Sequence, residues 1–418
     1  MIRTLWVELR RSPLRWWLPC LVALDLAVLF GRSRWWIGVW PEASVAAQIP
    51  SFYVGPLLAT AAAWSAARTH RHGMTDQVAV GSKPRWQVEV PLLAATTLYG
   101  LVAYAAGTLV AAAVTVRQAG PGFLWPGYLL LGAGVVVLCA SVGHLVGRWF
   151  PSGIAVPVIA GLSCFVALAA VGGPGALGFF VLSGAPYITV VPGALVARLV
   201  LAAAVAALAV FVPRPTGPVF RGASRILALC SVAVVLLAVV GVRAAGPVRE
   251  LRAAPSSQLC TGTTPKICVW PEQRKYLPQF EAMANRAAAL PAELIKSPAS
   301  FHEQGLRGGG ERDGDFSISE GSMWEAAVGI GMVIGNASEP RACEGANPAA
   351  SEQRFQAMFE IDSWITARIA GGGQPADRHG GPPGVDQAEI ARLVTTPEAH
   401  QIEWVKQRMQ AIGDIHCA

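Results

Sequence analysis

RILALCSVAVVLLAVVGVRAAGPVRELRAAPS, residues 225–256, contains the point at which the character of the sequence changes. The stretch is apolar up to Val242 and then becomes polar and rich in Gly and Pro. Six further apolar segments precede it. The residues that follow contain four cysteines, most of the acidic residues and several Gly/Pro loops. The sequence therefore predicts a membrane half that ends at residue 243 and a soluble half over residues 244–418.

The charges divide at the same place. Only 14% of the whole chain is charged, against about 25% in soluble globular domains. Residues 1–243 contain 17 Lys and Arg but five acids, whereas residues 244–418 contain 16 Lys and Arg against 21 acids. The net charge of +7 therefore arises in the membrane half. Its basic residues lie in short loops beside apolar segments, so membrane topology explains them and we expect no nucleic-acid partner. The 28 Arg against five Lys are typical of a GC-rich bacterium such as an actinobacterium.

Seven segments are candidates to cross a bilayer, which requires about 20 apolar residues per helix. The first is short, and it spans only if Trp16 and Trp17 lie at one interface and Trp35 and Trp36 at the other. Residues 176–191 are apolar but interrupted by Gly and Pro, which indicates a re-entrant or interfacial segment. We expect an all-α bundle with a six-span core and a seventh span. The predicted spans are residues 16–30, 50–67, 88–116, 127–147, 153–172, 194–212 and 225–243.

The distribution of Lys and Arg over the loops predicts the orientation, because cytoplasmic loops are enriched in positive charge. With a cytoplasmic N-terminus, twelve basic residues lie inside and three outside. Seven spans then place the soluble half outside the bacterial plasma membrane. The inside residues are Arg3, Arg10, Arg11, Arg15, Arg68, Arg71, Lys83, Arg85, Arg148, Arg214, Arg221 and Arg225, and the outside residues are Arg32, Arg34 and Arg117.

Four cysteines lie in the soluble half: Cys260, Cys268, Cys343 and Cys417. In an exported domain this number indicates two disulfides. Three pairings are possible, of which we favour Cys260–Cys268 and Cys343–Cys417. A zinc site is disfavoured because no CxxC pair is present.

The soluble half is expected to be small, mostly helical and tied by these disulfides. Apolar residues recur at helical spacing, and no strand pattern is evident. Neither an HExxH motif nor a GxSxG motif is present, so we do not expect an enzyme. The helices are predicted within residues 272–290, 320–335 and 351–370, with two more within 385–413.

The loop between the second and third predicted spans has the most informative layout. It reads Arg71-His72-Gly73-Met74-Thr75, continues through a short amphipathic stretch containing Val78, and ends in Ser82-Lys83-Pro84-Arg85. This layout resembles the first cytoplasmic loop of the membrane subunits of ABC transporters of the second exporter type. Residues 1–15 likewise look like the interfacial connecting helix of that family.

The resemblance implies a partner and a role for this loop. In that family the loop is the coupling helix that contacts the ATPase, which would assign this role to Arg71, Gly73, Met74, Val78, Lys83, Pro84 and Arg85. The chain contains no GxxxxGK[ST] motif, so ATP and Mg²⁺ would bind a separate cytoplasmic ABC ATPase. The other expected partners are a second permease copy or homologue and membrane lipid. The implied division of the chain is residues 1–15 (connecting helix), 16–212 (six-span domain), 213–243 (loop and seventh span) and 244–418 (extracytoplasmic domain).

Three polar residues in the predicted spans invite a functional interpretation. Asp25 lies in the middle of an apolar run, where a charge costs about 2.5–3.5 kcal/mol on insertion scales. It is either part of a structural ion pair, a protonated carboxyl group, or a residue of a substrate path. His144 and Arg198 lie near span ends and are expected to reach the headgroups.

Two other functions compete with the transporter subunit. The chain could be a membrane-anchored sensor, binding protein or enzyme whose spans only hold the tail. A secondary transporter is disfavoured, because ion-coupled carriers usually need charges inside the membrane and this sequence has few.

Overall fold

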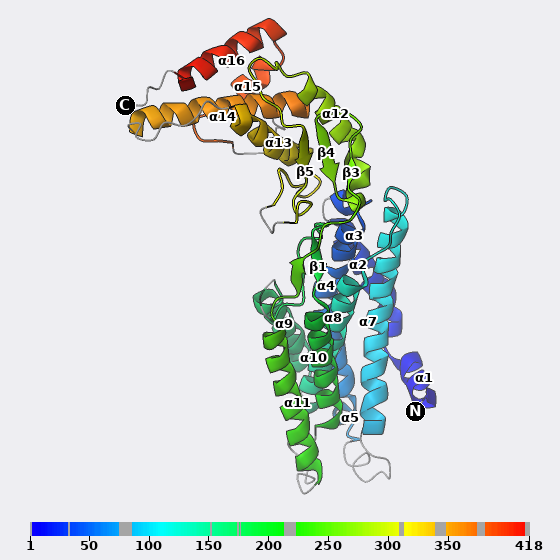
Figure 1. Ribbon diagram of the computed structural model, residues 1–418. Coiled ribbons are helices and arrows are strands. Elements are labelled where there is room, and N and C mark those ends of the chain that lie inside the picture. The colour runs from blue at the N-terminus through cyan, green and yellow to red at the C-terminus, as the bar shows by residue number, and fades with distance from the viewer. Residues whose placement is uncertain are drawn as a thin grey trace. The chain divides into compact units, whose positions relative to one another are not determined.

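The computed structural model describes residues 2–31, 34–74, 86–150, 153–173, 175, 177–212, 223–308, 313–338, 348–373 and 381–413. The chain forms two compact units. Unit 1 comprises Met1–Gly184 and Ile188–Glu250, and unit 2 comprises Ala185–Tyr187 and Leu251–Ala418. Both units are mostly helical, as the sequence predicts (Figure 1).

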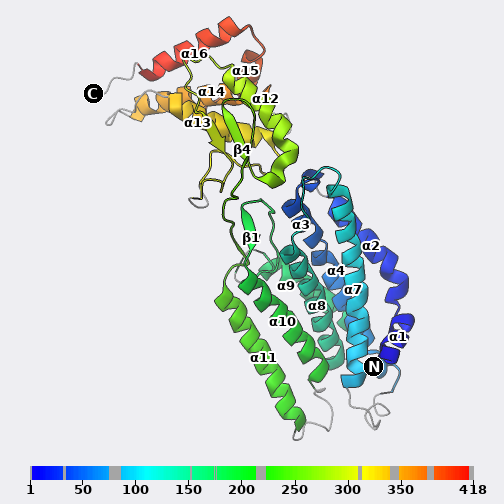
Figure 2. The ribbon, with the colours of Figure 1, turned by 45° about the vertical axis from the view of Figure 1, so that its right-hand side comes forward.

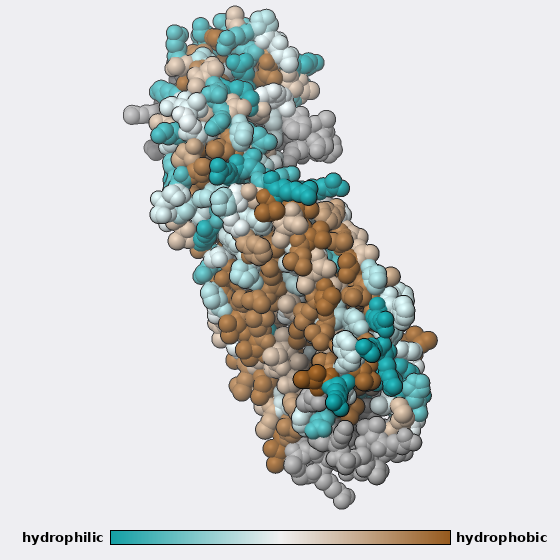
Figure 3. All heavy atoms as spheres, turned by 90° about the vertical axis from the view of Figure 1, so that its right-hand side faces the viewer, coloured by the Kyte–Doolittle hydropathy of each residue, from teal (hydrophilic) through white to brown (hydrophobic). Residues whose placement is uncertain are grey.

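Unit 1 is a bundle of long apolar helices. Among the described residues, six helical segments are long and apolar enough to cross a membrane. Figure 3 shows one face of this bundle, on which apolar residues predominate. The predicted span 153–172 forms a helix of 17 residues, which is shorter than the other six. The helices are α1 (Ile2–Arg11), α2 (Leu14–Gly31), η1 (Arg34–Trp36), α3 (Trp40–Gln48), α4 (Ser51–Ala66), α5 (Arg68–Arg71), α7 (Trp86–Thr115), α8 (Pro126–Trp149), α9 (Ala155–Val171), α10 (Pro192–Phe211) and α11 (Ala223–Ala245).

Contacts between the helices establish their directions along the bundle. Phe52 and Phe165 stack edge to face near one end of α4, whereas Gly161 lies against Thr60 further along it, so α9 runs antiparallel to α4. Contacts of the same kind between the other helices show that, within the described residues, successive segments run along the bundle in alternating directions (Figures 1 and 2). These segments are α2, α3 with α4, α7, α8, α9, α10 and α11. We call the end of the bundle that carries α5 the α5 end, and the opposite end the α3 end.

Helices α4 and α8 of unit 1 pack closely against each other. Gly143 and Gly147 of α8 lie directly on the backbone of Ala59 and Ala63 in α4. A Cβ atom at either glycine would collide with the carbonyl oxygen of the facing alanine. Small residues of this kind let membrane helices approach closely without the hydrophobic effect to draw them together.

A buried segment without helical structure closes the α3 end. Phe179, Phe180 and Val181 are each less than 5% exposed, although this part of the chain forms no helix. Side chains from the bundle bind its backbone: the Gln48 amide donates to the carbonyl oxygen of Phe179 and accepts from the amide of Val181, over 2.7 and 3.3 Å. Non-helical backbone is tolerated at such depth only where protein groups bind it. β1 (Ile188–Val190) follows and pairs with β2 (Arg249–Leu251).

Unit 2 combines a small sheet with helices. The predicted helices are present, whereas the expectation of no strands is wrong. Strand β4 pairs with β3 in antiparallel and with β5 in parallel orientation. Strands of two to four residues are too short for an alternating pattern to emerge in the sequence. The elements are β3 (Leu259–Cys260), β4 (Lys266–Val269), η2 (Pro271–Tyr276), α12 (Leu277–Ala288), β5 (Ser300–His302), α13 (Met323–Ser338), α14 (Pro348–Ala370), α15 (Gln387–Leu393) and α16 (Glu398–Gly413).

The α4–α8 contact predicts a strong dependence on one glycine. Gly143→Leu should destabilise unit 1 by about 1–3 kcal/mol or more. The added side chain would collide with the backbone of Ala59, which cannot rotate away as a side chain can. Gly241→Leu is the matched control, since Gly241 of α11 has nothing within 4 Å of its added Cβ. Thermal unfolding of the two variants in the same detergent measures the difference. Equal midpoints would contradict the packing described here.

Candidate functional site

The chain after α4 is fastened to the bundle at two points. The guanidinium group of Arg71 donates to the carbonyl oxygen of Trp64 over 2.8 Å and lies 3.6 Å from the centre of its ring. Arg68 donates to both carboxylate oxygens of Glu8, over 2.9 and 3.0 Å. Because Glu8 belongs to α1, this ion pair joins the amphipathic N-terminal helix to α5. The two contacts hold the beginning of the predicted coupling loop against the α5 end.

The loop leaves this anchorage through Gly73 and Met74. Gly73 has a φ of 65°, a left-handed conformation that favours glycine. Met74 follows with 37% of its surface exposed, and its amide donates to the carbonyl oxygen of Thr69. The structure thus places Arg71, Gly73 and Met74 together at the α5 end. The remaining predicted residues of this site, Val78, Lys83, Pro84 and Arg85, lie outside the described residues.

Three ionisable side chains from α7 and α8 meet inside the bundle. His144 Nε2 lies 3.1 Å from Glu89 Oε2, and Arg148 Nε lies 3.3 Å from Glu89 Oε1. Arg148 also donates to the carbonyl oxygens of Ala209 and Val210 at the end of α10. The cluster therefore links α7, α8 and α10. Removing one member of such a buried set leaves an uncompensated charge, which typically costs about 3–5 kcal/mol.

The expectation that His144 and Arg198 reach the headgroups is wrong, because both side chains are fully buried. His144 lies in the cluster with Glu89. Arg198 binds backbone carbonyl oxygens at the α3 end: Gly178 at 2.5 Å, Ala194 at 3.0 Å and Gly246 at 3.2 Å. Apart from Ala194, which lies in the same helix as Arg198, these partners come from other helices or distant loops, and span position alone cannot reveal them.

Asp25 is also buried, with 1% of its surface exposed. Its carboxyl group lies against Gly107 of α7, where a larger residue would collide with it. Its Oδ1 has no hydrogen-bond partner among the described residues. Asp25 therefore faces the α2–α7 contact, and the structure shows no ion pair for it in the described part of the chain.

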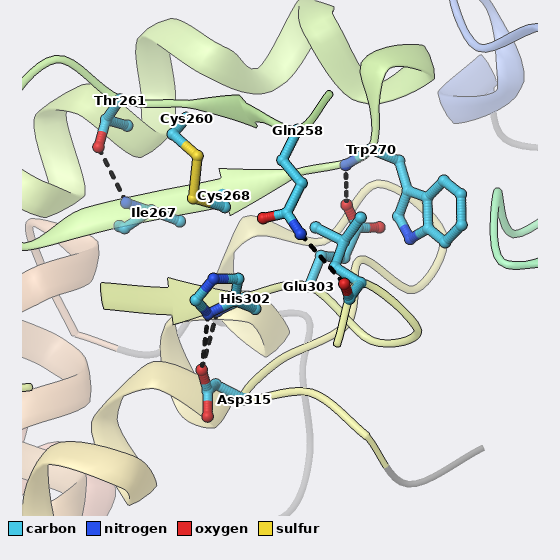
Figure 4. Close-up of a disulfide and its surroundings, with 10 residues drawn as sticks. Gln258, Cys260, Thr261, Ile267, Cys268, Trp270, His302, Glu303 and Asp315 are labelled. Carbon is cyan, nitrogen blue, oxygen red and sulfur yellow. Dashed lines mark hydrogen bonds and ion pairs between the residues drawn. A yellow bond between two sulfur atoms is a disulfide. The ribbon is translucent and has the colours of Figure 1, made fainter. Parts of the chain in front are cut away.

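A disulfide joins the predicted pair Cys260 and Cys268 in unit 2 (Figure 4). It connects β3 to β4 at directly paired residues, and Thr261 accepts the amide of Ile267 beside it. Cys343 and Cys417, the other predicted pair, lie outside the described residues. Among the residues that the structure describes, no three His, Cys, Asp or Glu side chains gather in a way that could hold a metal ion.

Glu303 lies buried next to this disulfide-linked sheet (Figure 4). Its Oε2 accepts the backbone amide of Trp270 over 3.0 Å. The pKa of Glu303 is raised to about 8, mainly because the carboxyl group is buried. The nearby Glu272 carboxylate contributes to this rise, and hydrogen bonds from Trp270 and Gln273 oppose it. The sequence draws attention to His302-Glu303 only as the beginning of an HExxH motif, which Leu306 breaks, and no sequence pattern shows that Glu303 is buried.

A cavity of about 360 Å³ lies in unit 2 between α13, α14 and α15. Trp324, Met332 and Phe359 supply apolar walls, and Asp362 and Gln387 supply polar groups. This volume falls within the range of small-molecule sites, roughly 300–1,000 Å³. The cavity gives unit 2 a place where a small apolar ligand could bind.

Glu303 predicts how the stability of unit 2 depends on pH. The pKa of Glu303 is higher in the folded protein than the ordinary value of 4.5. The contribution of Glu303 to the free energy of unfolding is therefore fully present below pH 4.5 and is lost as the pH rises to about 8. Protection of the 266–272 and 300–306 backbone from hydrogen exchange, corrected for intrinsic rates, should fall by at most about tenfold per pH unit in that window.

The variant Glu303→Gln retains an acceptor for the Trp270 amide but cannot titrate, so this pH dependence should disappear. Glu281→Gln, at an exposed position of α12, is the matched control and should behave as wild type. A Glu303→Gln protein with the same pH dependence as wild type would show that another group is responsible.

Part of this site leaves a trace in the sequence. His144 and Arg148 are four residues apart and hence lie on one face of a helix, which is a usable signal once α8 is recognised. Their acidic partner, Glu89, stands 55 residues away in the sequence and could not be assigned.

Comparison with known proteins adds no relative, since no protein-family model, no curated protein and no solved structure matches this chain.

Proposed function

We propose that this chain is the membrane subunit of an ATP-driven ABC transporter, which moves its substrate across the bacterial plasma membrane. Export is the favoured direction. In this proposal it works as a dimer with a second copy or a homologue. ATP and Mg²⁺ bind a separate ATPase on the cytoplasmic side, which is the side of the α5 end. The N-terminus is then cytoplasmic and unit 2 extracytoplasmic.

The observation that carries the proposal is the double fastening of the segment that follows α4. A loop that transmits force must be firmly attached to the helices it moves. Arg71 attaches it to Trp64 of α4, and Arg68 attaches it to Glu8 of α1. A loop that merely connects two anchoring helices needs neither contact.

The packing of the bundle supports a path for this force. Movement at α5 acts on α4, whose backbone lies directly against Gly143 and Gly147 of α8. The Glu89 cluster then connects α8 to α7 and α10. Closure of an ATPase dimer under the loop would thus shift several helices together, as alternating access requires.

The buried ionisable groups also favour a working bundle over an anchor. Charged residues inside membrane segments are costly and usually serve a function. Asp25, Glu89, His144, Arg148 and Arg198 are each less than 10% exposed. A set of helices that only holds a soluble domain at the membrane has no need of them.

The cavity of unit 2 favours a second candidate function, in which the chain is a membrane-anchored binding protein or sensor. Its occupant would be a small apolar molecule. In that case changes at the α5 end should leave the function intact, and changes in the cavity, such as Phe359→Ala, should abolish it.

Met74 provides the test of the transporter proposal. Met74→Asp places a charge where an apolar anchor would enter a cleft of the ATPase. Losing such an anchor typically costs about 2 kcal/mol or more, which corresponds to a loss of affinity of roughly thirtyfold or more. Co-purification of the ATPase with the tagged chain measures this loss. Phe355→Asp is the control, because Phe355 is an exposed apolar residue of unit 2 that does not line the cavity.

A second variant separates binding from force transmission. Glu8→Gln removes the charge that holds Arg68, so the ATPase should still co-purify while ATP hydrolysis becomes uncoupled from transport. If the wild-type chain brings down no ATPase from its own organism, the transporter proposal is wrong.

A further inference from the structure

A groove of about 730 Å³ runs along the surface of unit 1 between α1, α2 and α7. Leu18 of α2 and Leu98 and Val102 of α7 form its apolar floor. Trp6, Arg10 and Arg15 stand at its edge near the N-terminus. The groove thus has an apolar part along the helices and a basic part beside α1.

A hydrogen bond joins two of the helices that form the groove. The hydroxyl group of Tyr99 in α7 donates to the carbonyl oxygen of Leu9 in α1 over 2.7 Å. Glu8, the neighbour of Leu9, is held in turn by Arg68. The amphipathic helix α1 therefore has a defined place against α7, and the groove is part of the folded bundle.

The basic edge lacks acidic partners. Arg10 and Arg15 are exposed, and no carboxylate pairs with either of them in the part of the chain that the structure describes. Their recorded neighbours are aromatic: Arg10 lies 4.8 Å from the centre of the Trp6 ring, and Arg15 lies 5.4 Å from that of Trp16. Glu8 is the single acid of residues 1–24, and both its oxygens accept from Arg68. The positive charge at this edge is therefore not neutralised by these residues.

The surroundings identify the kind of ligand that fits. Leu98 is 40% exposed and Val102 is 51% exposed, on a helix long and apolar enough to cross a membrane. Two exposed tryptophans lie beside the arginines, Trp6 beside Arg10 and Trp16 beside Arg15, as is usual at the headgroup level. Figure 3 shows hydrophilic side chains next to the apolar surface at this end of the bundle. Guanidinium groups bind phosphate through paired N–H donors.

We propose that this groove binds an anionic phospholipid, with its phosphate between Arg10 and Arg15 and an acyl chain along Leu18, Leu98 and Val102. Basic pockets at the cytoplasmic side of membrane helices bind such headgroups in other proteins. The site does not depend on the transporter proposal, because it requires only that the bundle lies in a bilayer. Since α1 also holds Arg68 through Glu8, bound lipid would stabilise the anchorage of the loop after α4.

The test uses the full-length protein in a neutral detergent, with thermal unfolding and native mass spectrometry as readouts. Phosphatidylglycerol should raise the unfolding midpoint and remain bound, whereas phosphatidylcholine and inorganic phosphate should have much smaller effects. A ligand that binds only the folded state stabilises it by RT ln(1 + [L]/Kd), so the unfolding midpoint rises with the ligand concentration relative to its Kd. The variant Arg10→Gln/Arg15→Gln should lower the apparent affinity for phosphatidylglycerol by about tenfold or more, the expected result of losing a charge-assisted contact.

Two controls make the result specific. Arg34→Gln/Arg117→Gln removes two exposed arginines from the α3 end and should bind phosphatidylglycerol as wild type does. Val102→Trp fills the apolar part of the groove and should weaken binding with the arginines intact, which keeps the test valid if the double variant fails to fold.

Three outcomes would overturn the proposal. One is equal stabilisation by phosphatidylglycerol and phosphatidylcholine, and another is an equal effect of inorganic phosphate, which would indicate an ion site without a lipid. The third is disulfide cross-linking between two copies through Leu98→Cys or Val102→Cys, which would show that a second chain occupies the groove.

Discussion

The interior of a bilayer offers no water to bind a backbone amide or carbonyl group, and this constraint accounts for most of unit 1. Long helices satisfy their own backbone groups, and six helical segments among the described residues are long and apolar enough to cross a membrane. Where the chain departs from a helix, at Phe179–Val181, the side-chain amide of Gln48 supplies the missing hydrogen bonds. Arg198 does the same for the carbonyl oxygen of Gly178. Buried polar side chains here bind the backbone that the fold would otherwise leave without partners.

Helix α4 has a central place in the arrangement. It packs against α8 through Gly143 and Gly147, and its last residues lead into the segment held by Arg71 and Arg68. The same segment reaches α1 through Glu8, and α1 in turn borders the groove proposed to bind lipid. One continuous set of contacts therefore connects the residues that follow α4, the interior of the bundle and the groove beside α1. The proposed transport function and the proposed lipid site are separate claims, but they meet at Glu8.

Much of the fold is predictable from the sequence, because its signals are long. Apolar runs gave the positions of the seven bundle segments, and recurring apolar residues gave the helices of unit 2. Strands β3, β4 and β5 escaped prediction, since two to four residues cannot display a period. Less of the candidate site could be predicted from the sequence. His144 and Arg198 look like span-end residues until their partners are known, and those partners are distant in sequence: Glu89 for one, and the carbonyl oxygens of Gly178 and Gly246 for the other.

The proposed topology depends most on α9. The N-terminus and unit 2 lie on opposite sides of the membrane only if the 17 residues of this helix cross the bilayer. Gly153→Cys and Gly173→Cys flank this helix, and an added Cβ meets nothing within 4 Å at either position. Labelling of intact cells with a membrane-impermeant thiol reagent, before and after permeabilisation, measures their sidedness directly. The account predicts that position 173 is labelled in intact cells and position 153 only after permeabilisation. Labelling of both positions from the same side would contradict it.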